Sequence, residues 1–478
     1  MQKKFITNLA LLLFLNFLIK PFWLFGIDRS VQNAVTSEEY GVYFTLFNFS
    51  MLFNIVLDVG ITNFNNKNIA QHKQLLTKYL SGIVTFKFAL AVAYSLITFV
   101  AGYLSGFDSE RFYMLLFLSI NQFLISFIQY LRSNIAGLQL FALDSLLSVL
   151  DKTLMIVFCA VLLWGNVFEQ QFKLMDFVYA QTLAYSITLL IVFFVVLTKS
   201  KSFKFKLNVP FSVLILKQTY PYALLVLTMT FYYRLDAVML DVMLEDGEVQ
   251  NAIYAQAYRL MDASNQIGVL FAALLLPMFA KMIKAKERLE ELVKLSFSLI
   301  FLPAITVAII CFSFSEEITG LLYKGNTDAS SILSLLMFCF VAIASTYIFG
   351  TLLTANGSLR VLNKLAIAGM LLNVVLNYVL IPLYKAEGSA IASLITQLAV
   401  VIAQIFLVKN IFSFKVNHKF LVSITAYTFL LIAFVFVLNN LLLNSFYQVL
   451  IFIIFSILLG FILKIIDLRK MLEILMNR

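Results

Sequence analysis

The chain has 478 residues, of which 62% are hydrophobic and 13% are charged. A soluble domain has about 45–50% apolar residues and about 25% charged residues, so this composition excludes an ordinary soluble protein and indicates a polytopic membrane protein. The net charge of +10 does not indicate a nucleic-acid partner, because the basic residues are spread over many connections between apolar runs rather than gathered in one patch.

The apolar runs are about 20 residues long and show no strand alternation, which predicts an all-α fold and excludes a membrane barrel. The first run resembles a signal peptide, but Asn16 and Lys20-Pro21 interrupt it and no small-residue cleavage site follows, so we expect a retained first helix. About 14 membrane-spanning helices are predicted, at residues 7–27, 40–64, 79–102, 112–136, 140–163, 176–198, 210–240, 250–280, 293–313, 329–355, 361–381, 388–408, 420–439 and 445–465.

The basic residues between these segments predict the topology of the chain. Most of the 35 lysines and arginines fall on alternate connections and at both termini, which the positive-inside rule assigns to the cytoplasm. The opposite side receives Arg29, Arg111, Lys173, Lys324 and Lys385. We therefore expect both termini to be cytoplasmic.

Polar and charged residues within the segments form stripes at helical spacing. They are Lys20 in the first segment, Asn48, Asn54 and Asp58 in the second, Lys87 in the third, the run Gln122, Ser126, Gln129 and Ser133 in the fourth, and Lys217 in the seventh. Ionisable groups at membrane depth cost about 2.5–3.5 kcal/mol each on insertion scales, so they usually face a bundle interior or a wet cavity. The stripes therefore predict a polar cavity.

The seventh and eighth segments flank an acidic loop that contains Asp241, Glu245, Asp246 and Glu248. Arg234 and Asp236 precede this loop, and Arg259, Asp262 and Gln266 follow it, so an antiparallel helix pair would bring the four charges to similar depth. Two interpretations remain open: structural ion pairs that neutralise each other, or a cavity for a charged substrate. Arg234 and Asp236 point roughly 200° apart on a helix and cannot share one environment; we expect Arg234 to face the cavity and Asp236 to pack inward.

Neither cysteine nor histidine spacing indicates a metal site. Cys159, Cys311 and Cys339 lie inside apolar runs, and His72 and His418 lie alone in basic connections. No phosphate-binding glycine loop is present, so ATP use is not expected. We predict no cofactor, apart from H⁺ or Na⁺ as a coupling ion with Asp58 as the coupling acid.

A weak internal repeat relates residues 38–54 to 248–265, through Tyr43 and Tyr254 and through Asn54 and Asn265. It predicts an N-terminal six-helix lobe at 1–209, a C-terminal six-helix lobe at 210–410 and two additional helices at 411–478. Substrate sites of transporters built from repeats lie at the interface of the halves.

Three stretches resemble the Wzx-type polysaccharide flippases of the superfamily that includes the MATE exporters: SEEYGVYFTLFNFSMLFNIVLDVGITN, FYYRLDAVMLDVM with AIYAQAYRLMD, and GSLRVLNKLAIAGMLLNVVLNYVLIPLYKAEGSAIAS. The resemblance implies two pseudo-symmetric lobes in a V that open alternately to each face of a bacterial cytoplasmic membrane. It implies a lipid-linked oligosaccharide, usually on undecaprenyl pyrophosphate, moved from the inner to the outer leaflet. Membrane lipids and polysaccharide polymerase machinery are the other expected partners of a monomeric protein.

A pyrophosphate crossing lipid needs cationic partners, and Lys20, Lys87, Lys217, Arg234 and Arg259 are the candidates. The amides and acids of the stripes would line the cavity for the glycan. The main alternative is a MATE-like cation-coupled antiporter for small cations or drugs, which would favour acidic residues; here the bases outnumber Asp58, Asp236 and Asp262. A polymerase or ligase would need a catalytic outer loop with histidine and arginine, and the predicted outer loops contain no histidine.

Overall fold

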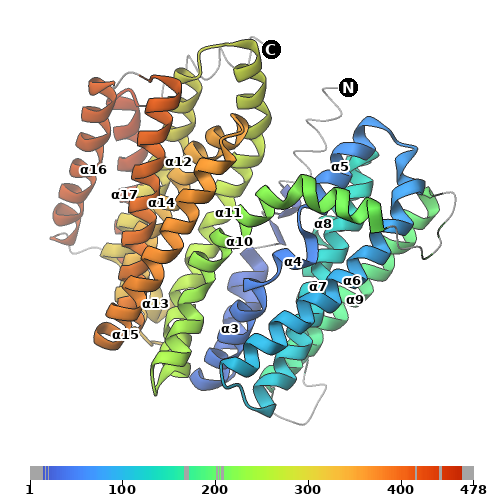
Figure 1. Cartoon of the computed structure of the whole chain (residues 1–478). Coiled ribbons are helices and arrows are strands. Elements are labelled where there is room, and N and C mark those ends of the chain that lie inside the picture. Colours follow the sequence, from blue (N-terminus) through green and yellow to red (C-terminus); the bar gives the residue numbers. More distant parts are fainter. Residues whose placement is uncertain are drawn as a thin grey trace. The chain divides into compact units, whose positions relative to one another are not determined.

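The computed structural model describes residues 14–16, 18–19, 21–165, 172–200, 203, 205, 209–414, 417–440 and 444–465. Every regular element in these ranges is a helix, which confirms the all-α fold class. The elements are the π-helix η1 (Phe22–Asp28) and the α-helices α2 (Arg29–Gln32), α3 (Ser37–Leu52), α4 (Ile55–Asp58), α5 (Ile61–Gln71), α6 (Leu75–Leu104), α7 (Ser109–Gly137), α8 (Phe141–Trp164), α9 (Leu174–Lys199), α10 (Val209–Met243), α11 (Gly247–Ala285), α12 (Glu290–Ser313), α13 (Ser315–Leu322), α14 (Ser330–Ala355), α15 (Leu359–Phe412), α16 (His418–Asn439) and α17 (Ser445–Ile462) (Figure 1).

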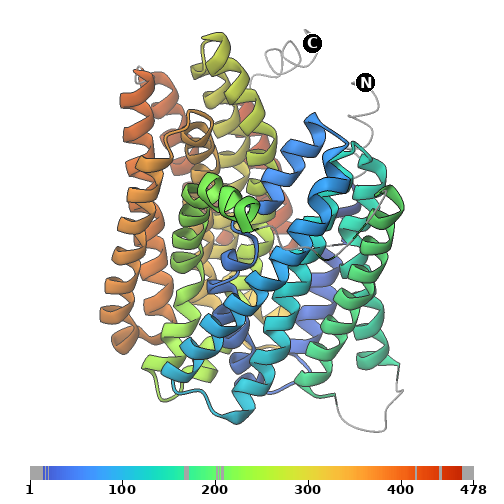
Figure 2. The ribbon, with the colours of Figure 1, turned by 45° about the vertical axis from the view of Figure 1, so that its right-hand side comes forward.

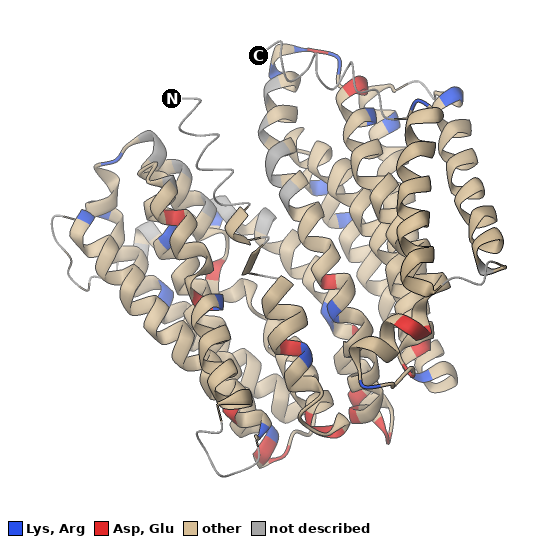
Figure 3. Cartoon of the chain, turned by 180° about the vertical axis from the view of Figure 1, so that it is seen from behind, with Lys and Arg blue, Asp and Glu red and all other residues tan. Residues whose placement is uncertain are grey.

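The described helices include ten that are long and apolar enough to cross a membrane. One of them, α15, has 54 residues, and Lys385 in its middle has φ 50° and ψ −131°, so it consists of two helices in sequence. These two helices correspond to the predicted segments 361–381 and 388–408. In the part of the chain that Figure 3 colours, charged residues lie near helix ends and also at places in the middle of helices. The chain is an integral membrane protein, and the total of about 14 spans stays a prediction.

The predicted second segment, 40–64, is not one continuous helix, and this prediction was wrong. The chain breaks after α3 and again between α4 and α5, so three short helices replace one (Figure 1). Val59 and Gly60 at the second break have φ angles of 45° and 82°. Glycine adopts this left-handed region readily, whereas a β-branched valine does so only at a cost of about 1–3 kcal/mol. Contacts from other helices must therefore hold the break in place.

The chain forms two compact units, Met1–Ala252 and Ile253–Arg478. Their boundary falls inside α11, whereas the sequence repeat places a boundary between 209 and 210, at the start of α10. The first unit keeps α10 because this helix packs along α3 (Figures 1 and 2). The assignment of 1–209, 210–410 and 411–478 as lobes and extra helices stays a prediction.

Each unit has its own apolar core. In the first unit, Leu80, Ile83 and Leu131 belong to a buried cluster that joins α6 and α7. In the second unit, α12, α16 and α17 share a core that includes a triangle of hydroxyl groups. The Thr306 hydroxyl lies 3.1 Å from that of Tyr427 and 2.8 Å from that of Ser456, and the last two are 2.8 Å apart.

Three connections of the first unit that the charge pattern assigns to the outside lie at one end of that unit. They are the start of α3, the turn between α6 and α7, and the turn between α10 and α11 (Figures 1 and 2). This arrangement agrees with the predicted topology, because segments on one side of a membrane must share one end of the bundle.

We expect a topology reporter fused at Gly247 to be extracytoplasmic and one fused at Lys204 to be cytoplasmic. The measurement is the activity of paired reporters that work on only one side of the membrane. Finding both fusions on the same side would refute the topology.

Candidate functional site

The break between α4 and α5 forms the centre of a buried polar site in the first unit. Its main partner is Lys87 on α6, which is only 1% exposed. The Lys87 Nζ atom donates to the backbone carbonyl of Leu57 at 3.0 Å and to Oδ1 of Asp58 at 3.2 Å. It also lies 3.1 Å from the carbonyl oxygen and 2.7 Å from the hydroxyl oxygen of Ser126 on α7. One ammonium group therefore ties α4, α6 and α7 together.

This ammonium satisfies the backbone polar groups that the helix break exposes. Carbonyls at the end of a helix have no partner within it, and lipid offers none, so irregular backbone at membrane depth must be paired inside the protein. Lys87 supplies that pairing for Leu57. Its three protons already face protein oxygens, so a phosphate could reach this lysine only by displacing them.

Asp58 is the more accessible member of the ion pair, with a side chain 23% exposed against 1% for Lys87. Its carboxylate also accepts from the Thr62 hydroxyl at 2.5 Å and from the Thr62 backbone N–H at 3.3 Å. A buried ion pair is stable only when further hydrogen bonds satisfy both partners. The pair is therefore built into the fold, and Asp58 is the member that a small cation or a proton can approach.

A chain of amide and hydroxyl groups continues from this centre between α3, α4, α6 and α7. Asn54 donates to Oε1 of Gln122 at 2.7 Å, and Gln122 donates to the Ser50 hydroxyl at 3.3 Å. The Tyr94 hydroxyl donates to the Ser50 carbonyl at 2.8 Å. The predicted residues thus belong to two hydrogen-bonded groups among these helices, one with Asp58 and Lys87 and one with Asn54 and Gln122.

Arg234 and Asp236 on α10 face different surroundings, as their spacing requires. Arg234 is partly exposed, and its Nη1 lies 3.3 Å from Oδ1 of Asn48 on α3. Asn48 is 1% exposed and also donates to the Phe44 carbonyl at 2.8 Å. Asp236 is 1% exposed. Arg234 is therefore the member of the two that can meet a ligand.

The remaining predicted site residues lie elsewhere. Gln129 is exposed, although Gln122 and Ser126 of the same stripe are buried. Lys217 is exposed on the first half of α10. Lys20 lies outside the described residues. In the second unit, Arg259 and Asp262 on α11 are partly exposed and Gln266 is exposed. A shared depth for Arg234, Asp236, Arg259 and Asp262 stays a prediction, because the first two belong to one unit and the last two to the other.

Two groups of contacts were missed by the sequence analysis. Lys152 on α8 lies 3.1 Å from the Tyr185 hydroxyl, 3.9 Å from a carboxylate oxygen of Asp151, and 5.2 Å from the centre of the Trp23 ring. Arg111 at the start of α7 binds Asp241 and Glu248, which belong to the acidic loop. The sequence contained a signal for the second group. Arg111 is an isolated basic residue on the predicted outer side, and the predicted topology places the acidic loop on that same side.

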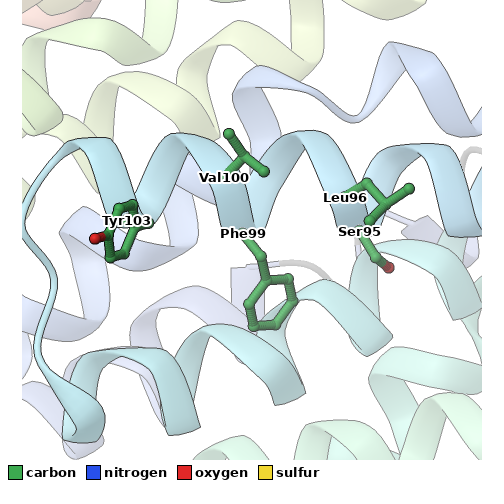
Figure 4. Close-up of a pocket in the computed structure, with 5 residues that line it drawn as sticks. All are labelled: Ser95, Leu96, Phe99, Val100 and Tyr103. Carbon is green, nitrogen blue, oxygen red and sulfur yellow. The ribbon is translucent and has the colours of Figure 1, made fainter.

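A hollow of about 370 Å³ on α6 is not part of this site (Figure 4). It is lined by Ser95, Leu96, Phe99, Val100 and Tyr103. Leu96 and Tyr103 are 63% and 76% exposed, and these residues lie on the face of α6 opposite Lys87. Exposed apolar side chains on a membrane helix are suited to contact with lipid.

The site combines a broken helix, a buried ion pair and hydrogen-bonded amide groups. Among the described ranges, no group of three or more His, Cys, Asp or Glu residues could hold a metal ion. Broken helices with paired charges and amides are typical of the substrate and ion sites of secondary transporters.

Comparison with known proteins identifies the family of the chain and the class of its fold. The family model described as polysaccharide biosynthesis protein matches residues 25–283. The fold is similar to that of the lipid II flippase MurJ in an inward closed conformation, with a TM-score of 0.75 and 17% identity over 97% of this chain and 100% of that chain. It is also similar to an inward-facing multidrug resistance MATE family transporter of the MOP superfamily, with a TM-score of 0.64 and 16% identity over 82% of this chain and 94% of that chain.

A third similar structure is a MOP superfamily transporter from Pyrococcus furiosus, with a TM-score of 0.60 and 14% identity over 85% of this chain and 95% of that chain. No match was found among curated protein sequences. These likenesses confirm the predicted MATE/MOP-like fold.

Proposed function

This chain belongs to the polysaccharide biosynthesis protein family, and we propose that it flips a lipid-linked oligosaccharide from the inner to the outer leaflet of a bacterial cytoplasmic membrane. The observation that carries the proposal is the family match over residues 25–283. A fold shared with a lipid II flippase supports it, because that protein also handles a lipid-linked substrate. The carrier that we propose is undecaprenyl pyrophosphate, and the movement is by alternating access.

Recognition of the pyrophosphate is assigned to Arg234 and Arg259. Both are partly exposed on helices that carry long apolar stretches, so each can present a guanidinium to an anion away from bulk water. Arginine suits this task because its planar group binds phosphate oxygens in pairs and never loses its charge. Lys87 holds the break in the second membrane segment instead, since its protons already face Leu57, Asp58 and Ser126.

Asp58 is proposed as the coupling acid, with H⁺ or Na⁺ as the ion. Its carboxylate is partly exposed and pairs with a buried ammonium. Protonation or cation binding at Asp58 would weaken its attraction to Lys87 and loosen α4 against α6. The ion gradient would thereby change the packing of the broken helix between α4 and α5.

Charge reversal at Arg259 should abolish surface polysaccharide while the protein remains in the membrane at its normal level. The Arg259→Glu variant would present a carboxylate to the pyrophosphate, and like charges repel strongly at low dielectric. The measurements are surface glycan by specific staining and membrane protein by immunoblot.

The matched control is Arg288→Glu, because Arg288 is exposed between α11 and α12 and should tolerate the same reversal. Normal export by the Arg259→Glu variant at normal abundance would show that Arg259 does not bind the pyrophosphate. The proposed function itself would fail if deletion of the whole chain left surface glycan unchanged and caused no lipid-linked oligosaccharide to accumulate.

A further inference from the structure

A second polar cluster lies at the end of the first unit that carries the α10–α11 turn. Arg111 at the start of α7 places Nη1 2.5 Å from Oδ2 of Asp241 and Nη2 2.6 Å from Oε1 of Glu248. Asp241 lies in the last turn of α10 and Glu248 in the first turn of α11, so one guanidinium holds both sides of the turn.

The helix α3 joins the same cluster from the other side. The Thr45 hydroxyl lies 3.4 Å from Oδ1 of Asp241, and Asn251 donates to that hydroxyl at 2.7 Å. Asn251 also donates to the Ala237 carbonyl at 2.6 Å. Thr45 and Asn251 are both 0% exposed, so the contact excludes water. The cluster therefore joins α3, α7, α10 and α11 at one end of the unit.

The backbones of α3 and α11 approach each other closely at this place. A Cβ atom at Gly41 would collide with the backbone carbonyl of Glu248. Only glycine lets the two helices come this near. The contact thus combines a steric fit at Gly41 with a charge cluster at Arg111.

The exposure of its side chains and the predicted division into lobes distinguish this cluster from a permanent structural contact. The side chains of Arg111 and Glu248 are 21% and 41% exposed, so water and salt can replace their pairing when the helices separate. The side chain of Asp241, by contrast, is only 2% exposed, so the closed cluster shields this carboxylate from water. The structure places the whole cluster within the first unit, Met1–Ala252. The lobes predicted from the sequence repeat divide it between α3 and α7 on one side and α10 and α11 on the other, and with these lobes alternating access would require the two sides to part.

We propose that Arg111, Asp241, Glu248, Thr45, Asn251 and Gly41 form a releasable latch that closes the α10–α11 hairpin against α3 and α7 at the extracytoplasmic end. Closure excludes water from the face of α10 that carries Asp241. Release exposes that face once in each transport cycle. The proposal rests on the transport function proposed above, but its test does not require the substrate.

The test measures how fast an impermeant maleimide, added outside intact cells, labels a cysteine at position 237. Ala237 suits this purpose because it is 2% exposed and lies one turn before Asp241 on the same face of α10. The three native cysteines are buried, and the parent chain without the substitution gives their background.

In the Ala237→Cys background, Arg111→Gln should raise the labelling rate about tenfold or more, because the shielded carboxylate of Asp241 loses its charged partner and separation becomes more favourable. Gly41→Ala should raise it by a similar factor through steric conflict alone, with every charge retained. Glu248→Gln should give a smaller rise, since Arg111 keeps Asp241. The exchange Arg111→Asp with Asp241→Arg should bring labelling back toward the parent rate.

The matched control is Arg132→Gln, which breaks the 2.9 Å pair with Asp144 at the other end of α7 and should leave labelling unchanged. The latch is refuted if Arg111→Gln and Gly41→Ala both leave position 237 protected, or if Arg132→Gln exposes it equally. If Arg111→Gln fails to reach the membrane, Gly41→Ala and Glu248→Gln decide the question. The two proposals can fail separately. If the variants increase labelling but glycan export does not depend on this chain, the latch is supported and only the proposed function is refuted.

Discussion

Replacement of Lys87 by methionine is expected to remove most of the folded protein from the membrane. Methionine fills a similar volume but donates nothing, so the Leu57 carbonyl and the Asp58 carboxylate both lose their buried donor. Breaking a buried pair in this way costs about 3–5 kcal/mol, a large share of the about 5–15 kcal/mol that stabilises a typical domain. Membrane protein level and the midpoint of thermal unfolding in detergent are the measurements.

Two further variants distinguish the effect of losing the ion pair from the effect of general damage to α6. Lys78→Met changes an exposed lysine on the same helix and should leave the midpoint unchanged. Lys87→Met combined with Asp58→Asn should unfold at a higher temperature than Lys87→Met alone, because no unpaired carboxylate remains. A normal midpoint for Lys87→Met would show that this lysine does not hold the helix break.

Arg234→Ala should reduce export at least about tenfold while the protein level stays normal, whereas Asp236→Ala should reduce the protein level. A hydrogen bond to a charged group contributes about 1.5–3 kcal/mol, which corresponds to a factor of about 10–100 in binding. Arg234 is partly exposed, so water can fill its place. Asp236 is 1% exposed, and its removal takes a charged acceptor from a closed interior. Glycan export and membrane protein level should be measured for both variants.

The conservative changes sharpen this pair of predictions. Arg234→Lys keeps the charge but loses the paired donors, so it should retain part of the export. Asp236→Asn keeps the shape and should be more abundant than Asp236→Ala. If Arg234→Ala is unstable while Asp236→Ala is abundant and inactive, the two assignments are inverted and the acid becomes the residue of the site.

The positions of the helices could be predicted from the sequence because membrane helices are specified by local composition. Apolar length and basic connections identified the segments that became α6, α7, α8 and α9. The breaks around α4 could not be predicted in this way. Gly60 is a weak signal by itself, and Val59 is a residue that normally resists the conformation it adopts here. The contact that holds the break comes from Lys87, about 30 residues away in the chain.

The candidate site was predictable as a set of residue types but not as a set of partners. Helical spacing grouped Gln122, Ser126 and Gln129, yet only the first two are buried. Lys87 looked like a phosphate ligand because it is a lone cation in an apolar run, whereas three neighbouring oxygen-bearing residues already surround it. The pairing of Arg111 with Asp241 spans 130 residues, and no local pattern reports such a contact.

The hydroxyl triangle of Thr306, Tyr427 and Ser456 has a consequence for how the second unit assembles. Insertion of the helices into the membrane and their packing against one another are two different stages. Lipid is as apolar as the faces of α12, α16 and α17, so the bilayer gives these helices little reason to associate once they have inserted. Shape and hydrogen bonding must then select the partner and the rotation of each helix. Because each hydroxyl meets the other two, one rotational setting satisfies all three helices together. Helices α16 and α17 can therefore acquire their orientation by packing after they have inserted.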